Sequence, residues 1–178
     1  GNNNSKDYVF KLDNALPLFN VYEVTGYGYT QSGVYYYGGD YPTILLHAII
    51  SDSANNLWNI SVYLETQEIV FFYWDTNTNS WMYTIYNTSL VSQVTISGDR
   101  SSAEIYVYTD AAKLSDGQYT LKTTARDDAG YVNSNSIKIA VDWTPPTIID
   151  FWGEPWPGDY GTWDNYCVIE GQWDIYYK

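Results

Sequence analysis

Leu114-Ser115-Asp116-Gly117-Gln118-Tyr119 opens the stretch that decides the fold, and Ile-Lys-Ile-Ala-Val at 137–141 closes it. Between 119 and 126, and again between 137 and 141, side chains on one face are more apolar than those on the other. A period of two is typical of strands that bury one face on a core. The residues between these runs are mostly polar and include Gly130, which is typical of a turn. The stretch therefore predicts two half-buried strands joined by a polar turn.

Tyr119 stands near the start of the first of these strands. In Greek-key β-sandwiches a tyrosine at this place folds back, and its hydroxyl caps backbone groups of the crossing loop in a tyrosine corner. We expect Leu114 to fill the core beneath the loop. Gly117 permits a tight turn because glycine has no Cβ. Leu114, Gly117 and Tyr119 thus predict a corner between two sheets.

Residues 114–148 resemble the end of bacterial and archaeal immunoglobulin-like (fibronectin-III-like) modules. Those modules run DGxYxLxxxAxDxAG, then a last strand, then DxTPPxI into the next domain, and this chain matches at 116–130 and 142–148. It departs from them at Tyr131, where a small polar residue is usual, and in an aromatic insertion at 68–86. The resemblance implies an extracellular sandwich and says almost nothing about a ligand, because this fold carries many functions.

The rest of the chain predicts an all-β protein. Short apolar or alternating runs are separated by Gly, Pro, Asn and Asp, and no amphipathic helix is evident. The run at 43–51 is almost continuously apolar, which is typical of a central strand covered on both faces. The expected strands are 8–12, 20–25, 34–37, 43–51, 57–65, 68–74, 81–86, 91–96, 103–108, 118–126, 136–142, 147–151, 166–170 and 173–177.

Pro145 and Pro146 predict a domain boundary, because neither can donate to a β-ladder and the pair stiffens the chain. We divide the chain into an N-terminal β segment at 1–42, an Ig-like Greek-key sandwich at 43–145 and a C-terminal β segment at 146–178. Each end segment has too few strands for a domain alone. Three arrangements would complete these end segments. The two ends could pair into a second small β-domain, or the tail could open a further module. Alternatively, a terminal strand could exchange into a neighbouring subunit.

Residues 8–12 are the candidate donor strand for such an exchange, since Tyr8, Phe10 and Leu12 share one face. The alternative is an ordinary edge strand of its own domain. Strand donation would build a linear polymer in which the assembly satisfies an open edge. The Tyr-, Asn- and Thr-rich, Lys-poor composition is similar to thread-like surface filament subunits of archaea, a resemblance of composition without a motif.

The 178 residues carry a net charge of −13. Such a chain repels nucleic acid and anionic membranes, and no apolar run is long enough for membrane insertion, so neither partner is expected. Cys167 is the only cysteine, which excludes an intrachain disulfide. With Lys and Glu scarce, these features favour a prokaryotic extracellular or cell-surface location.

Three Asn-x-Ser/Thr sequons start at Asn3, Asn59 and Asn87. They are glycosylation candidates if the protein is exported in an archaeon or a eukaryote. Chance is the alternative explanation, because the chain is rich in Asn, Ser and Thr.

Asp127 and Asp128, together with Asp142 at the linker, form a candidate Ca²⁺ site, since carboxylates at a domain junction offer oxygen ligands. The favoured alternative is that Asp127 and Asp128 simply make the turn. No other cofactor is expected.

Aromatic residues offer a second binding hypothesis. Trp74, Trp81 and Tyr83 are candidates for stacking against sugar rings if they share an exposed face. Core filling and cross-strand aromatic pairs are the alternative.

Catalysis is not expected. His47, the only histidine, lies in the most apolar strand, which favours a buried structural role, and no zinc spacing, nucleophile elbow or phosphate loop is present. Acidic pairs of the glycosidase kind, Glu65 with Glu68 or Asp159 with Asp164, arise freely in so acidic a chain. The predicted function is a non-catalytic structural subunit of a surface layer or filament, whose partners are copies of itself or other surface proteins. The alternative is a carbohydrate-binding or adhesion module.

Overall fold

The computed structural model describes residues 13–145, 147–155 and 163–170. The candidate donor residues Tyr8, Phe10 and Leu12, the sequon at Asn3 and the expected strand at 173–177 lie outside the described residues. Contacts along the chain divide it into two compact units that meet between Trp143 and Thr144.

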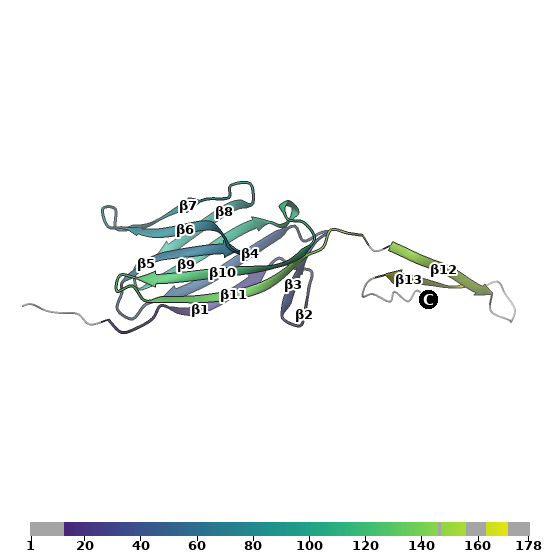
Figure 1. The fold of residues 1–178 in the computed structure, drawn as a ribbon, viewed down its shortest axis with the longest axis horizontal. Helices are drawn as coiled ribbons and strands as arrows, with labels where there is room; N and C mark the ends of the chain where they lie inside the picture. The colour runs from purple at the N-terminus through teal and green to yellow at the C-terminus, as the bar shows by residue number, and fades with distance from the viewer. Residues whose placement is uncertain (1–12, 146, 156–162, 171–178) are drawn as a thin grey trace, which may run out of the picture. The chain divides into compact units, whose positions relative to one another are not determined.

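The first unit is a β-sandwich of two sheets (Figure 1). The four-stranded sheet has the order β1 (Leu18–Thr25), β4 (Thr43–Ser51), β9 (Ser102–Asp110), β8 (Val91–Gly98). The seven-stranded sheet has the order β2 (Tyr29–Gln31), β3 (Val34–Tyr37), β11 (Val132–Val141), β10 (Gly117–Asp127), β5 (Leu57–Leu64), β6 (Gln67–Asp75), β7 (Ser80–Ile85). A short 3₁₀ turn, η1 (Ala111–Lys113), follows β9.

This strand order is that of an immunoglobulin-like fold. β1, β4, β9 and β8 take the places of strands A, B, E and D, while β11, β10 and β5 take those of G, F and C. β6 and β7 extend the second sheet as the two additional strands of variable-type domains do. The predicted all-β sandwich is confirmed.

The core lies between the sheets and is lined by alternate side chains. In β4 the residues at 44, 46, 48 and 50 are buried while those at 45, 47, 49 and 51 are half-buried. The expectation that this strand is covered on both faces is therefore wrong: its outer face is open to solvent, although large apolar side chains stand on it. β9 repeats the alternation in register, with Ile105 opposite Ala48 and Val107 opposite Leu46.

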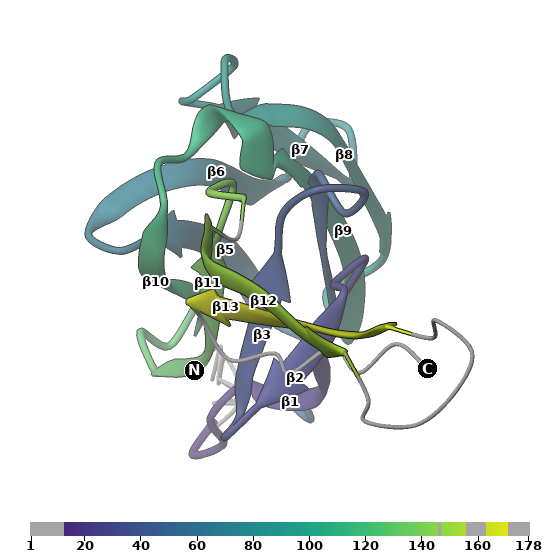
Figure 2. The ribbon, with the colours of Figure 1, turned by 90° about the vertical axis from the view of Figure 1, so that its right-hand side faces the viewer.

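The segment at 1–42 differs from its sequence-based description, because its described strands belong to the sandwich. β1 pairs antiparallel with β4, β3 pairs parallel with β11, and β2 forms a hairpin with β3. The end view of Figure 2 places β1, β2 and β3 along one side of the sandwich, with β7 and β8 along the other. Period-two alternation indicates a strand but not its partner, so the sequence could not assign these strands to the sheets.

The second unit is a two-stranded antiparallel sheet, and its described strands come from the C-terminal end alone. β12 (Thr147–Pro155) pairs with β13 (Trp163–Glu170), with a register shift between Ile148 and Asp150. Within the described part of the chain, no helix is long and apolar enough to span a membrane.

Candidate functional sites

The corner at the start of β10 ties the crossing loop to the strand. Tyr119 Oη donates a hydrogen bond to the carbonyl oxygen of Ser115 at 2.9 Å, which is the defining contact of a tyrosine corner. Leu114 packs against the core, and Gly117 has a φ of +154° that favours glycine. The backbone N–H of Trp143 donates to Asp116 Oδ1 at 2.7 Å. The loop therefore also holds the chain where it leaves the sandwich.

The three residues proposed for sugar stacking do not share an exposed face. Trp81 is only 8% exposed, and its indole Nε1 donates to the carbonyl oxygen of Asp99 at 3.1 Å. Trp74 meets the Trp81 ring edge-on, 5.6 Å between centroids, and packs against the core. Tyr83, in the edge strand β7, is 48% exposed. Trp81 is therefore a core residue, and its ring is not available for stacking.

A different set of side chains forms an apolar surface on the outer face of the seven-stranded sheet. We call Phe71, Tyr73 and Met82 the β6–β7 patch. The Phe71 and Tyr73 rings stack at 5.9 Å, and Met82 lies directly opposite Tyr73. Tyr73 and Met82 are exposed. Alternation in the sequence separates 71 and 73 from 70, 72 and 74, but only the sheet packing shows which set faces solvent.

β8 is an open edge of the four-stranded sheet. Its sequence, Val-Ser-Gln-Val-Thr-Ile-Ser-Gly, contains no charged residue and no proline. A register shift between Val91 and Gln93 interrupts the pairing with β9 at one end, and the ladder is regular from Gln93 to Gly98. Natural edge strands are usually protected by lysine, proline or short length, so β8 has the features of a pairing edge.

The two described sequons lie in different settings. Asn59 is in β5, an interior strand, where it is paired with Tyr73 and Arg126 and half-buried. Asn87 follows β7 in a turn, and its Oδ1 accepts hydrogen bonds from the Leu90 N–H and the Ser89 hydroxyl. A modifying enzyme reaches the backbone around Asn87 more easily than that around Asn59, because Asn87 does not lie in a strand.

The predicted trio Asp127, Asp128 and Asp142 is not brought together. Asp128 pairs with Arg100. Strand β11 begins at Val132, which is paired with Arg126, next to Asp127. Asp142 follows Val141, the last residue of the same strand. Ten strand residues at about 3.3 Å each put Asp142 roughly 30 Å from Asp127. Only Asp127, which is buried, joins a group of carboxylates.

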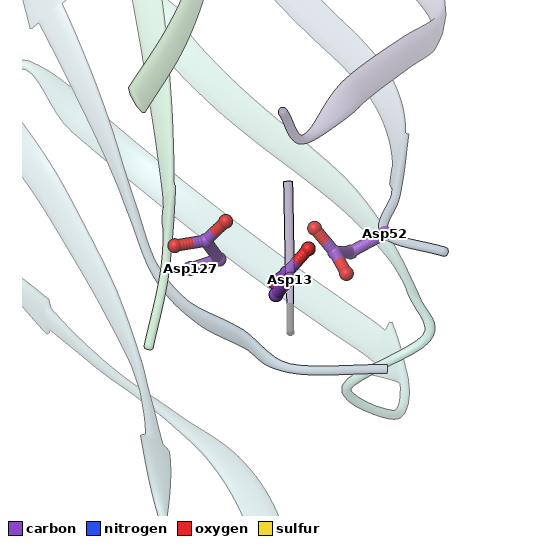
Figure 3. Close-up of side chains that lie close together, drawn as sticks. All are labelled: Asp13, Asp52 and Asp127. Atoms are coloured by element: carbon purple, nitrogen blue, oxygen red, sulfur yellow. The ribbon is translucent and has the colours of Figure 1, made fainter. Parts of the chain in front are cut away.

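That group consists of Asp13, Asp52 and Asp127 (Figure 3). One carboxylate oxygen from each lies within 4.8 Å of those of the other two. Asp13 precedes β1, Asp52 follows β4, and Asp127 ends β10. Asp13 and Asp52 were missed in the sequence, because each stands alone without a ligand-spacing motif.

His47 lies on the outer face of the four-stranded sheet, not in the core. Its Nδ1 and Nε2 lie 3.0 Å from carboxylate oxygens of Glu23 and Glu104 respectively, and the Tyr106 ring stacks on the imidazole at 4.4 Å. Hydrogen bonds from Tyr106 and His47 lower the pKa of Glu104.

Of the two acidic pairs considered for catalysis, the structure describes the side chains of Glu65 and Glu68. Glu65 lies in the turn between β5 and β6, where Oε1 accepts from the backbone N–H of Thr120. Asp159 lies outside the described residues.

No protein-family model matches the chain, and no curated protein matches it. One solved structure that matches part of the chain is described as "GspB Siglec domain", with 16% sequence identity and a TM-score of 0.39. The match covers 76% of this chain and only 61% of that one.

Proposed function

We propose that this chain is a non-catalytic extracellular module that assembles with copies of itself by β-strand addition at the β8 edge. The observation that carries the proposal is β8 itself, an edge strand of eight residues without charge or proline. Its unpaired backbone groups offer main-chain hydrogen bonds to an added strand, and alternate side chains supply specificity.

Charge limits where two copies of the chain can meet. The chain carries −13 overall, so two copies repel one another wherever their acidic surfaces meet. β8 contains none of that charge, whereas β1, the opposite edge of the same sheet, carries Glu23. The edge strands β7 and β2 of the other sheet are also uncharged, but they have only six and three residues, so β8 offers an added strand the longest uncharged edge. The proposed donor is the segment at 8–12, whose Tyr8, Phe10 and Leu12 would face the acceptor once it adds to β8 as a strand.

Electron microscopy and light scattering of the purified chain test this assembly. We expect polymers whose length increases with salt, because salt screens the like charges. Thr95→Lys places a charge in the middle of β8, on the outer face opposite Tyr106, and should abolish the polymers.

The matched control is Thr124→Lys, on the outer face of β10, where the strand is paired with β11 on one side and with β5 on the other, so the same charge change meets no edge. Polymers should persist in that variant. Monodisperse monomers of the unmodified chain at every salt concentration, or equal assembly by both variants, would overturn the proposal.

A second candidate function is carbohydrate binding at the β6–β7 patch. The exposed ring of Tyr73, which stacks with the half-buried ring of Phe71, favours it, because aromatic faces pack against sugar rings. A glycan array with the wild type, Tyr73→Ala and Tyr131→Ala tests it. Tyr131 is similarly exposed but lies in the β10–β11 turn. Binding that survives Tyr131→Ala and disappears with Tyr73→Ala supports this function, and no binding to any glycan eliminates it.

A further inference from the structure

Three aspartates from distant parts of the chain are fixed in place at one end of the sandwich. In each, Oδ1 accepts a backbone N–H: that of Ala15 for Asp13 at 3.0 Å, that of Ala54 for Asp52 at 2.7 Å, and that of Tyr131 for Asp127 at 2.8 Å. These bonds anchor each carboxylate on one oxygen while the three groups converge (Figure 3).

Among the residues that the structure describes, the second oxygens of the two buried carboxylates have no hydrogen-bond partner. Asp52 is 3% exposed and Asp127 1% exposed, and Oδ2 of each is unpaired. Oδ1 of Asn56 is buried and unpaired as well, while its Nδ2 donates to Asp13 Oδ2. Burying an ionised oxygen without a partner costs several kcal/mol, so such groups are normally paired or bind a metal.

No cationic side chain supplies the missing partner within the described part of the chain. The recorded ion pairs join His47 to Glu23 and Glu104, and Arg100 to Asp128. Arg100 also donates to the backbone carbonyls of Asn56 and Leu57, so its donors are directed to the neighbouring turn. Among the described residues, therefore, no side chain donates a hydrogen bond to Oδ2 of Asp52 or of Asp127.

We propose that Asp13, Asp52 and Asp127 bind one Ca²⁺ ion, with Oδ1 of Asn56 as a further ligand. All the donors are oxygens, which suits a hard cation and excludes the His and Cys ligation typical of zinc. Ligands on opposite sides of a Ca²⁺ ion are about 4.6–5.2 Å apart, twice the usual Ca–O distance. The span of up to 4.8 Å between the carboxylate oxygens fits one such ion.

The ion would connect the segment before β1 to the ends of β4 and β10. These elements belong to both sheets, so bound Ca²⁺ would close this end of the sandwich and hold the N-terminal segment against it. Loss of the ion should therefore lower the stability of the whole sandwich and not only the order of one loop.

Calorimetric titration of the EDTA-treated full chain with CaCl₂ tests the site. We expect one ion per chain, a Kd of about 1 mM or tighter as in extracellular calcium modules, and a rise of several degrees in the melting temperature. The same concentration of MgCl₂ should give a much smaller rise, because Mg²⁺ requires a near-ideal octahedron. The proposal would be overturned if Ca²⁺ raised the melting temperature no more than Mg²⁺ does. It would also be overturned if Ca²⁺ gave neither binding heat nor a rise in melting temperature up to about 10 mM.

Variants separate the site from general screening of acidic charge. Asp52→Asn and Asp127→Asn should each weaken Ca²⁺ binding at least tenfold, and both should fold in EDTA because the amide removes charge repulsion without changing size. Asp128→Asn is the control, since Asp128 is the next residue in the chain but pairs with Arg100. A calcium response that is unchanged in the Asp52→Asn/Asp127→Asn double variant, or lost equally in Asp128→Asn, would also contradict the site.

Discussion

Tyr119 and Ser115 are joined by a hydrogen bond from the phenol Oη to a carbonyl oxygen four residues upstream. The bond lies where the chain crosses from β9 to β10, so it fixes the passage from one sheet to the other. Asp116, inside the same loop, accepts the backbone N–H of Trp143. One loop thus stabilises both the crossing between the sheets and the exit of the chain toward the second unit.

Tyr119→Phe should lower the free energy of unfolding by about 0.5–1.5 kcal/mol, because it removes one hydrogen bond and leaves the ring in place. Urea unfolding should show a lower midpoint with an unchanged slope. Tyr86→Phe is the control, since Tyr86 is 56% exposed outside the corner and should change stability little. Equal decreases in the free energy of unfolding of the two variants would show that the Tyr119–Ser115 hydrogen bond does not stabilise the fold.

Trp81→Ala should lower the free energy of unfolding by about 3–5 kcal/mol, the range for an aromatic deletion in a core. The variant loses both the packing against Trp74 and the bond to the Asp99 carbonyl. Tyr83→Ala, at the exposed edge of the same strand, should cost far less. A small effect of Trp81→Ala on stability, combined with lost glycan binding, would instead support a stacking role.

Ionisation of the Tyr22 phenol should contribute to a decrease in the free energy of unfolding at alkaline pH. Burial raises the pKa of this phenol from 10.0 to about 12, and Oη donates to the Leu121 carbonyl. The unfolded chain therefore releases this proton first. The stability that the neutral phenol provides is complete below pH 10.0 and is lost as the pH rises to about 12.

Tyr22→Phe should start less stable at neutral pH and lose up to about 2–3 kcal/mol less than the wild type on this rise. Denaturant midpoints at several pH values measure the difference. Tyr83→Phe controls for the other tyrosines. Parallel pH profiles for the wild type and Tyr22→Phe would contradict the assignment.

Gly38→Ala should destabilise the sandwich much more than Gly39→Ala. A Cβ at Gly38 would lie 1.9 Å from the Asp142 carbonyl oxygen, and the backbone there has a φ of +156°. Gly39 also has a positive φ, +54°, but a Cβ at that position would meet nothing within 4 Å. Gly39→Ala should therefore cost only about 1–2 kcal/mol of backbone strain. Similar melting temperatures for the two variants would contradict the close approach of Gly38 to Asp142.

The sequence predicted most strands of the sandwich because alternation and turn chemistry are local. The expected strands at 34–37 and 43–51 coincide with β3 and β4, and the turn after β10 lies where Asp127–Gly130 suggested. The short β2 was missed, since three residues give no period to detect. The faces of β6 and β7 were also unassigned, because apolar and aromatic side chains stand on both faces of these strands.

The sequence by itself determined the fold class, the strands around Tyr119 and the corner residues, since these depend on neighbours a few positions apart. Only the tertiary structure decided that β1 and β3 join opposite sheets, because each pairs with a strand remote in the chain. It also decided the grouping of Asp13, Asp52 and Asp127. No spacing rule connects these three residues, and their carboxylates meet only because both sheets end beside the segment before β1.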